Sequence, residues 1–95
     1  MSDFRNVTSE QRFEQGFADA DGILRAVWAD YAVQGDRHAI LHVEAAEQLR
    51  GSGAAGQFMQ RLADYARTEK ITLVPRCSYA VAWFKRHPDY ADVLG

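Results

Sequence analysis

The sequence has little of several features that would assign a chain to a specialised class. Its single cysteine, Cys77, excludes an internal disulfide and favours a reducing, cytoplasmic location. No apolar run approaches the roughly 20 residues that cross a bilayer, and residues 1–11 lack the pattern of a signal peptide. Basic residues are not in excess, because the net charge is -2. We therefore expect neither a nucleic-acid nor a membrane partner.

The length and composition indicate one ordinary globular domain. The chain has 95 residues, of which 47% are hydrophobic and 25% are charged. Residues 1–11 contain few apolar side chains, so they are expected to form a flexible arm. Residues 12–95 are expected to form the single domain.

The first half of that domain has the pattern of a β-meander. Strands are predicted at residues 12–17, 23–33 and 38–44, which are rich in branched and aromatic side chains. Short turns separate them, and the first contains Asp21-Gly22, a strong hairpin signal. Three strands joined this way should be antiparallel.

The second half changes to a helical period. Apolar side chains at helical spacing predict a helix over residues 54–67, followed by a short buried strand at 71–74. Ser78 is a plausible N-cap for a second helix at 79–86, which Pro88 ends. The whole is an α+β (mixed α/β) fold, with an antiparallel meander followed by helix, parallel strand and helix.

The most informative stretch is the glycine-rich segment 48–56 (QLRGSGAAG) between the third strand and the first helix. Glycine lets the backbone approach a ligand closely. The first turn of a helix also leaves amide hydrogens unpaired at the positive end of the helix dipole. These features predict a site for an anion, most naturally a phosphate.

Two patterns fit this loop. Residues 51–56 match GxGxxG, the dinucleotide fingerprint, but that pattern should follow its strand directly, and six residues separate Glu44 from Gly51. It also expects an acidic residue after the next strand, where this chain has Arg76 and Cys77. Residues 48–53 match (Gln/Arg)-x-x-Gly-x-(Gly/Ala) instead.

The second pattern resembles the pyrophosphate loop of the GNAT superfamily of acetyl-CoA-dependent N-acetyltransferases. Residues 75–77 (Pro-x-Cys), the aromatic helix after them and residues 87–90 (His-Pro-Asp-Tyr) resemble a short, single-domain GNAT-like subfamily. The resemblance covers about residues 13–93. It implies a minimal GNAT-like fold with acetyl-CoA as co-substrate and no metal.

The resemblance also implies which residues bind the cofactor. The pyrophosphate would be bound by backbone amides of the loop, namely those of Leu49, Arg50, Gly51, Ser52, Gly53, Ala54 and Ala55. Pantetheine would hydrogen-bond backbone groups of Val43 and Ala45 at the end of the preceding strand. Arg50, Lys85 and Arg86 are placed in sequence to meet CoA phosphates, or simply to lie on a solvated surface.

The chain departs from the family pattern in two ways. The segment between the first two strands has no room for the helices that wall the acceptor site in larger members, so this side should be open or covered by a partner such as a second copy. Phe84 stands where many members have a tyrosine that protonates the departing thiolate. Tyr79 is a weaker candidate for that acid.

Three residues are candidates for catalysis. His38, Ile40, His42 and Glu44 alternate along one strand, so we expect them on one face. His42 or Glu44 could take the proton of an ammonium acceptor, directly or through water, or could belong to an ordinary polar face. Cys77, before a helix, could carry the acetyl group or be a small buried side chain.

The leading hypothesis is an acetyl-CoA-dependent acyltransferase that moves an acetyl group to an amine, via or beside Cys77. The acceptor could be a small amine, a polyamine or a protein lysine, and a homodimer could complete the site. The alternative is a CoA-binding module without turnover, acting as a sensor or interaction protein. A weaker third hypothesis is a nucleotide-binding domain.

Overall fold

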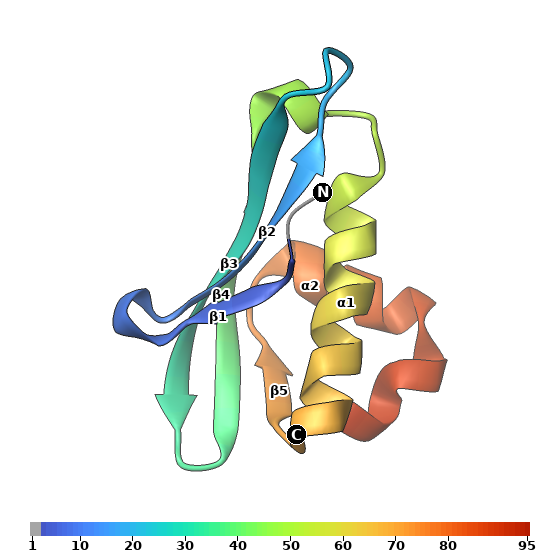
Figure 1. Cartoon of the computed structure of the whole chain (residues 1–95). Coiled ribbons are helices and arrows are strands. Elements are labelled where there is room, and N and C mark those ends of the chain that lie inside the picture. Colours follow the sequence, from blue (N-terminus) through green and yellow to red (C-terminus); the bar gives the residue numbers. More distant parts are fainter. Residues whose placement is uncertain (1–2) are drawn as a thin grey trace.

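The computed structural model describes residues 3–95 and contains a five-stranded mixed sheet (Figure 1). The strands lie in chain order and are antiparallel, except that the last pairs in parallel with the fourth. Their bounds are β1 (Arg5–Val7), β2 (Arg12–Ala18), β3 (Leu24–Gln34), β4 (Arg37–Ala45) and β5 (Thr72–Pro75). The expected α+β fold, with a parallel strand after the meander, is confirmed.

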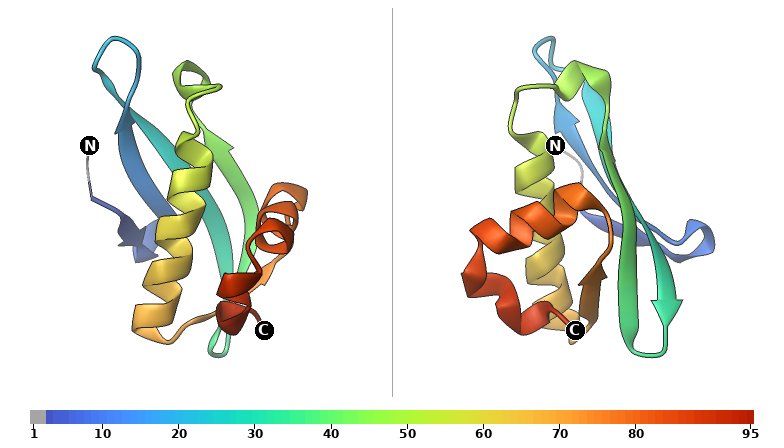
Figure 2. Two further views of the ribbon diagram at one scale, coloured as in Figure 1. Left: turned by 90° about the vertical axis from the view of Figure 1, so that its right-hand side faces the viewer. Right: turned by 180° about the vertical axis from the view of Figure 1, so that it is seen from behind.

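Both α-helices lie on the same face of the sheet (Figure 2). Helix α1 (Ala54–Glu69) crosses the middle of the sheet, and α2 (Ser78–Arg86) packs beside it near β4 and β5. Short 3-10 helices are η1 (Thr8–Glu10), η2 (Glu47–Leu49) and η3 (Pro88–Val93). Neither α-helix of the described chain is both long and apolar enough to cross a membrane.

The core forms between this face and the helices. The largest fully buried side chains come from four strands and α1, and they are Phe13, Phe58, Ile40, Met59, Leu62, Leu73 and Val27. Burial of each such side chain contributes about 1.5–3 kcal/mol to folding. Among residues 3–95, no α-helix covers the opposite face of the sheet, so this second face is open to solvent.

The N-terminal segment differs from the expected loose arm. Within residues 3–11, β1 pairs with β2 and Phe4 is buried against Phe13, Phe58 and Tyr65. One aromatic anchor is enough to order the segment, because it adds both packing and a strand. Met1 and Ser2 lie outside the described residues.

A β-bulge in β4 determines which side chains share a face. Asp30 lies opposite His42, whereas the next residue of β3, Tyr31, lies opposite Ile40, so Leu41 is the extra residue. Before the bulge Ile40 faces the helices and is fully buried. After it, His42 and Glu44 face solvent, with side chains 55% and 50% exposed. The expected single face for His38, Ile40, His42 and Glu44 is therefore wrong, because the bulge shifts the alternation by one residue.

The C-terminal segment is tied to α1. The Tyr90 hydroxyl donates to Asp64 at 2.9 Å, and Arg67 forms two hydrogen bonds to the Asp92 carboxylate. His87 stacks on Trp83, with ring centroids 3.9 Å apart. These contacts give the His-Pro-Asp-Tyr motif a packing role at this end of the molecule.

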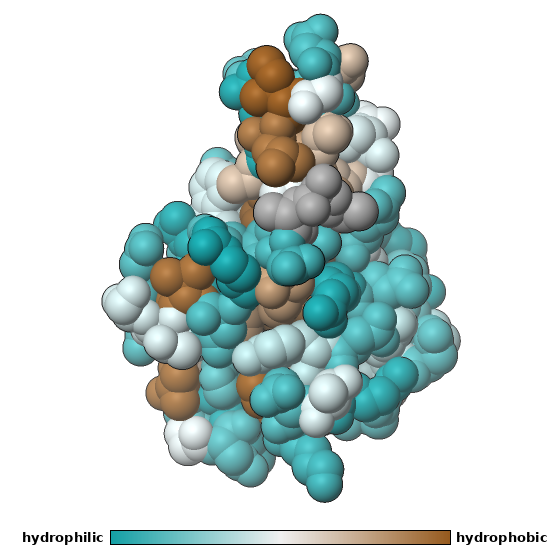
Figure 3. Space-filling view, viewed as in Figure 1, coloured by the Kyte–Doolittle hydropathy of each residue, from teal (hydrophilic) through white to brown (hydrophobic). Residues whose placement is uncertain are grey.

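Two exposed apolar side chains lie at the other end. Ile23 and Leu24, in and after the β2–β3 turn, are each about half exposed. The space-filling view shows hydrophobic surface at this tip (Figure 3).

Candidate functional site

The loop between β4 and α1 is held by its own backbone and one buried side chain. Leu49, at the end of η2, is 3% exposed and anchors the loop in the core. Gly51 and Gly53 have φ angles of +79° and +82°, a left-handed conformation that favours glycine. The Ser52 hydroxyl donates to the Leu49 carbonyl at 2.6 Å, which closes the turn. The loop is therefore preorganised.

The amides of this loop fall into two groups. Those of Leu49, Arg50 and Ser52 donate to carbonyls within residues 46–49, and that of Ala54 donates to the Ser52 hydroxyl. Within residues 3–95, the structure gives no protein acceptor to the amides of Gly51, Gly53, Ala55 and Gly56. Helix α1 has no side-chain N-cap and no acidic residue in its first turn. The second group of amides therefore forms an electropositive cluster with free donors.

A row of backbone groups on β4 leads to this cluster. The Ala46 amide donates to the Ala26 carbonyl, which fixes the phase of hydrogen bonding between β3 and β4. Because the bonds of an antiparallel pair alternate, Val43 and Ala45 direct their N–H and C=O groups away from β3. Strand β5 pairs with β4 only as far as Ile40. On that side, residues 41–45 therefore have no strand partner within the described chain.

Cys77 lies where β5 leaves β4. The amides of Arg76 and Cys77 both donate to the Ile40 carbonyl, at 2.9 and 3.2 Å. The thiol, rather than the predicted Ser78 hydroxyl, caps α2, because Cys77 has the extended backbone of an N-cap and its sulfur accepts from the Ala80 amide at 3.4 Å. The Cys77 side chain is half-buried, and it packs against the core.

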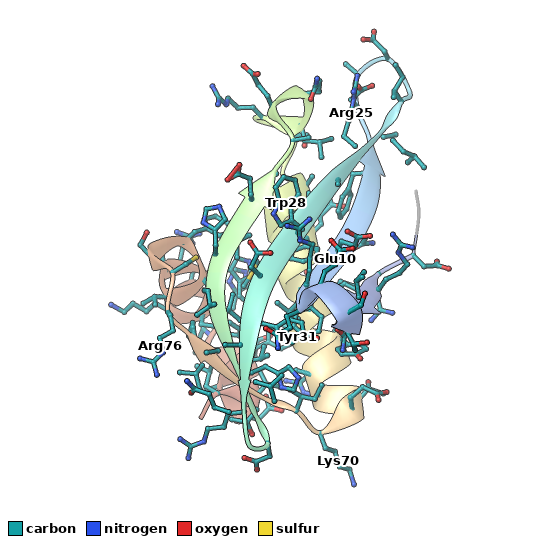
Figure 4. The ribbon with its side chains drawn as sticks, turned by 90° about the vertical axis from the view of Figure 1, so that its left-hand side faces the viewer. Glu10, Arg25, Trp28, Tyr31, Lys70 and Arg76 are labelled. Atoms are coloured by element: carbon teal, nitrogen blue, oxygen red, sulfur yellow. The ribbon has the colours of Figure 1, made fainter. Side chains whose placement is uncertain are left out.

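His42 and Glu44 lie together on the open face of the sheet, and Figure 4 looks onto this face. His42 Nε2 and Glu44 Oε1 are 2.7 Å apart. His42 is two residues along β4 from Ile40, whose carbonyl accepts from the Cys77 amide. Among the described residues, no direct contact joins the His42–Glu44 pair to the Cys77 thiol. His42 with Glu44 can accept a proton from a group approaching from solvent.

His38 does not belong to this pair. It lies before the bulge, and its ring is 5.0 Å from that of Tyr31 in the core layer. Burial lowers the pKa of His38, which favours the neutral ring. His38 is therefore a packing residue.

The remaining candidates lie on α2. Phe84 is buried, with its ring 5.1 Å from that of Trp83. Tyr79 is half-buried, and burial raises the pKa of its hydroxyl, so the hydroxyl stays protonated at neutral pH. Arg86 is exposed in the last turn, as Arg50 is in the loop. Among the described residues no three His, Cys, Asp or Glu side chains converge into a metal site.

Comparison with known proteins agrees with this arrangement. The family model described as GCN5-related N-acetyl-transferase matches residues 13–93. The chain belongs to the GCN5-related N-acetyltransferase family. Members of this family generally use acetyl-CoA.

The fold comparison is independent of that match. The NMR structure of a GCN5-like protein from Staphylococcus aureus superimposes with a TM-score of 0.66 at 21% sequence identity. The match covers 98% of this chain and 87% of the other. It therefore shows a shared fold. A search of curated proteins gave no match.

Three features of the candidate site and the sheet face beside it were not anticipated from sequence. Gly56 contributes a free amide, and its place as the last glycine of the loop was the available signal. The Ile40 carbonyl joins the strand to the cysteine turn, which only pairing could reveal. Trp28 lies half-buried on the open face, where its register partners are Glu14 and Glu44.

Proposed function

We propose that this GNAT domain is an acetyl-CoA-dependent acyltransferase that moves an acetyl group to an amine. The observation that carries the proposal is the set of free amides at the start of α1, next to groups of β4 that have no strand partner within the described residues. A diphosphate needs several converging N–H donors, and an extended amide chain such as pantetheine needs a strand edge. The free amides of the loop and the part of β4 beyond its pairing with β5 adjoin along the chain, and this order supports the proposal because CoA carries its pyrophosphate next to pantetheine.

In this proposal the cofactor lies along β4. The pyrophosphate accepts from the amides of Gly51, Gly53, Ala55 and Gly56, and the amides of Leu49, Arg50, Ser52 and Ala54 hold the turn in shape. The amide groups of pantetheine pair with backbone groups of Val43 and Ala45. The thioester then lies towards Ile40 and Cys77, and Arg50 and Arg86 supply positive charge near the phosphates.

The chemical step transfers the acetyl group from sulfur to nitrogen. The neutral amine attacks the thioester carbonyl, a C–N bond forms, and the C–S bond breaks to release CoA thiolate. The ammonium proton passes to the His42–Glu44 pair, directly or through water. The thiolate takes a proton from solvent or from the Tyr79 hydroxyl, because Phe84 has none to give.

A second route uses Cys77 as a carrier. Its thiolate attacks acetyl-CoA, and an acetyl-cysteine thioester forms as CoA leaves; the amine then displaces the cysteine sulfur. The half-buried position of the thiol at the end of β5 supports this route. A domain that binds CoA without turnover is the alternative that the buried Phe84 favours.

Calorimetric titration with acetyl-CoA tests the proposal. We expect saturable binding that ADP weakens by competition. Absence of binding at millimolar acetyl-CoA would refute both the enzyme and the binding module. Mass spectrometry after incubation with acetyl-CoA and a panel of amines then separates them, because an acetylated amine or acetyl on Cys77 supports the enzyme, whereas binding without either product supports the module.

A further inference from the structure

The open face of the sheet carries an aromatic side chain between two carboxylates. Trp28, on β3, lies directly opposite Glu14 on β2 and Glu44 on β4. The next row on the same face contains Asp30, opposite Arg12 and His42. Figure 4 shows Trp28 on this face. An aromatic ring flanked by carboxylates is an arrangement that attracts organic cations.

The protein's own arginine already occupies this position. The Arg12 guanidinium carbon lies 5.3 Å from the centroid of the Trp28 ring, and Arg12 Nε donates to Asp30 at 3.1 Å. Both side chains of that ion pair are about one third exposed, so the contact contributes little to stability. Arg12 thus shows which group fits here, and a second guanidinium could replace it at low cost.

In the proposed reaction, the open face is the side from which the acceptor approaches. Helices α1 and α2 cover the other face, so an acceptor reaches the thioester from the open one. Glu44 belongs both to the row of Trp28 and to the proton-accepting pair. A hollow of about 200 Å³ adjoins the row, and its lining includes Glu14 together with two arginines, Arg5 and Arg25.

We propose that this face binds a basic polypeptide segment, in which an arginine displaces Arg12 over Trp28 and a nearby lysine is the acetyl acceptor. The inference rests on the proposed acyltransferase function. A polypeptide is favoured over a small amine because the face is a broad sheet surface, whereas small molecules bind in concave sites that enclose most of their area. Arg5 already pairs with Glu14 and His42 with Glu44, so the carboxylate that an incoming arginine gains by displacing Arg12 is that of Asp30.

The direct test uses the indole signals of the two tryptophans, Trp28 and Trp83, in a nitrogen–proton NMR spectrum. The probe is a short blocked Gly/Ser peptide with a lysine and an arginine one residue apart, since these side chains share a face when the peptide is extended. We expect the Trp28 signal to shift saturably and that of the buried Trp83 to stay. The matched peptide with glutamate for arginine should not shift Trp28. A shift of equal size with spermidine, or concentration-dependent shifts without peptide, would overturn the assignment to a basic polypeptide.

Variants distinguish the proposed binding site from a purely structural role of Arg12, because the two predict different changes in affinity for the peptide. Arg12→Gln frees the ring and Asp30, so affinity for the peptide should rise about twofold to fivefold. Lys70→Gln makes the same change in net charge at the far end of α1 and should leave affinity almost unchanged. Trp28→Ala removes the indole reporter, so its binding is followed by the backbone amides of the neighbouring Glu14 and Glu44, which the peptide should no longer shift, with the Trp83 signal as the check on folding. Unchanged or weaker binding by Arg12→Gln would contradict the proposal.

The proposed cofactor site and the proposed acceptor face can be refuted independently of each other. Acetyl-CoA is expected to shift the amides of Gly51 and Gly53, whereas the peptide is expected to shift Trp28. Loss of the first response refutes the proposed cofactor site. Loss of only the second refutes the acceptor face and leaves the acyltransferase proposal standing.

Discussion

The two α-helices of this domain begin in opposite ways. Helix α2 begins at Cys77, whose sulfur accepts from the Ala80 amide, at a turn tied to β4 through the Ile40 carbonyl. Helix α1 begins at Gly53, which has no side chain to act as a cap; the Ser52 hydroxyl accepts from the Ala54 amide, and the amides of Ala55 and Gly56 stay free within the described residues. Capping contributes about 1 kcal/mol at many helix starts, so leaving the longer helix uncapped has a stability cost. The proposed function accounts for this difference, because the proposal places the pyrophosphate at the start of α1.

Changing Gly56 tests this comparison most strongly. Gly56 lies in the first turn of α1, and a Cβ added there would meet nothing within 4 Å. Gly56→Asp places a carboxylate beside the proposed pyrophosphate, so affinity for acetyl-CoA should fall at least about tenfold, as like charges repel. Gly56→Asn is the neutral control of the same size. Calorimetry measures both affinities.

The aspartate that weakens acetyl-CoA binding should increase the free energy of unfolding relative to the asparagine variant. A carboxylate in the first turn of a helix interacts favourably with the dipole, so Gly56→Asp should be more stable than Gly56→Asn by about 0.3–1 kcal/mol. Denaturant unfolding measures this difference. Equal affinity of the two variants for acetyl-CoA would remove the start of α1 from the cofactor site.

Changing Cys77 tests the capped helix. Cys77→Ala removes the acceptor of the Ala80 amide and should lower the free energy of unfolding by about 0.5–1 kcal/mol. Cys77→Ser supplies a hydroxyl acceptor and should match or exceed the stability of the parent chain. Thermal unfolding measures the order of the three proteins. If serine were as destabilising as alanine, the thiol would stabilise the domain by packing rather than by capping.

The same pair of variants separates the two chemical routes. If Cys77 carries the acetyl group, Cys77→Ser should lose most turnover while still binding acetyl-CoA. If the amine attacks directly, Cys77→Ser should keep turnover within a few-fold of the parent. Product formation by mass spectrometry distinguishes these outcomes.

The smallest expected effect concerns the other end of α1. The hydrogen bond from Arg67 lowers the pKa of Asp92, so the folded-state pKa lies below the unfolded value. Its stabilisation is then complete above the unfolded pKa and is lost as the pH falls through the folded one. Asp92→Asn should therefore reduce stability above about pH 5 and match the parent chain at strongly acid pH. Asp89→Asn, in the same segment, is the control, and urea titrations across pH measure both.

Much of the fold could be predicted from local pattern. The apolar period of α1 and the turn residues between β2, β3 and β4 identify these elements to within two residues. The β1 strand and the capping of α2 could not be predicted in this way. Phe4 becomes ordered only because distant aromatic rings surround it, and Cys77 caps only because the end of β5 sets its backbone angles.

Some features of the candidate site could likewise be predicted from local sequence, whereas others depend on the folded structure. The glycine loop is visible in sequence because glycine is required where φ is positive and where a backbone amide must stay accessible. Which amides remain free is a property of the folded turn, since Leu49, Arg50, Ser52 and Ala54 use theirs within the loop. The positions of His42 and Glu44 depended on a bulge, which a period-two pattern does not reveal.

By itself, therefore, the sequence determined the order of strands and helices and the position of the glycine-rich loop, because both follow from side-chain periodicity and glycine geometry within short segments. The tertiary structure decided which face of the sheet is open and which side chains share it. Those properties depend on strand register and helix packing between residues far apart in the chain, and a one-residue shift in β4 is enough to move His42 and Glu44 from the core to solvent.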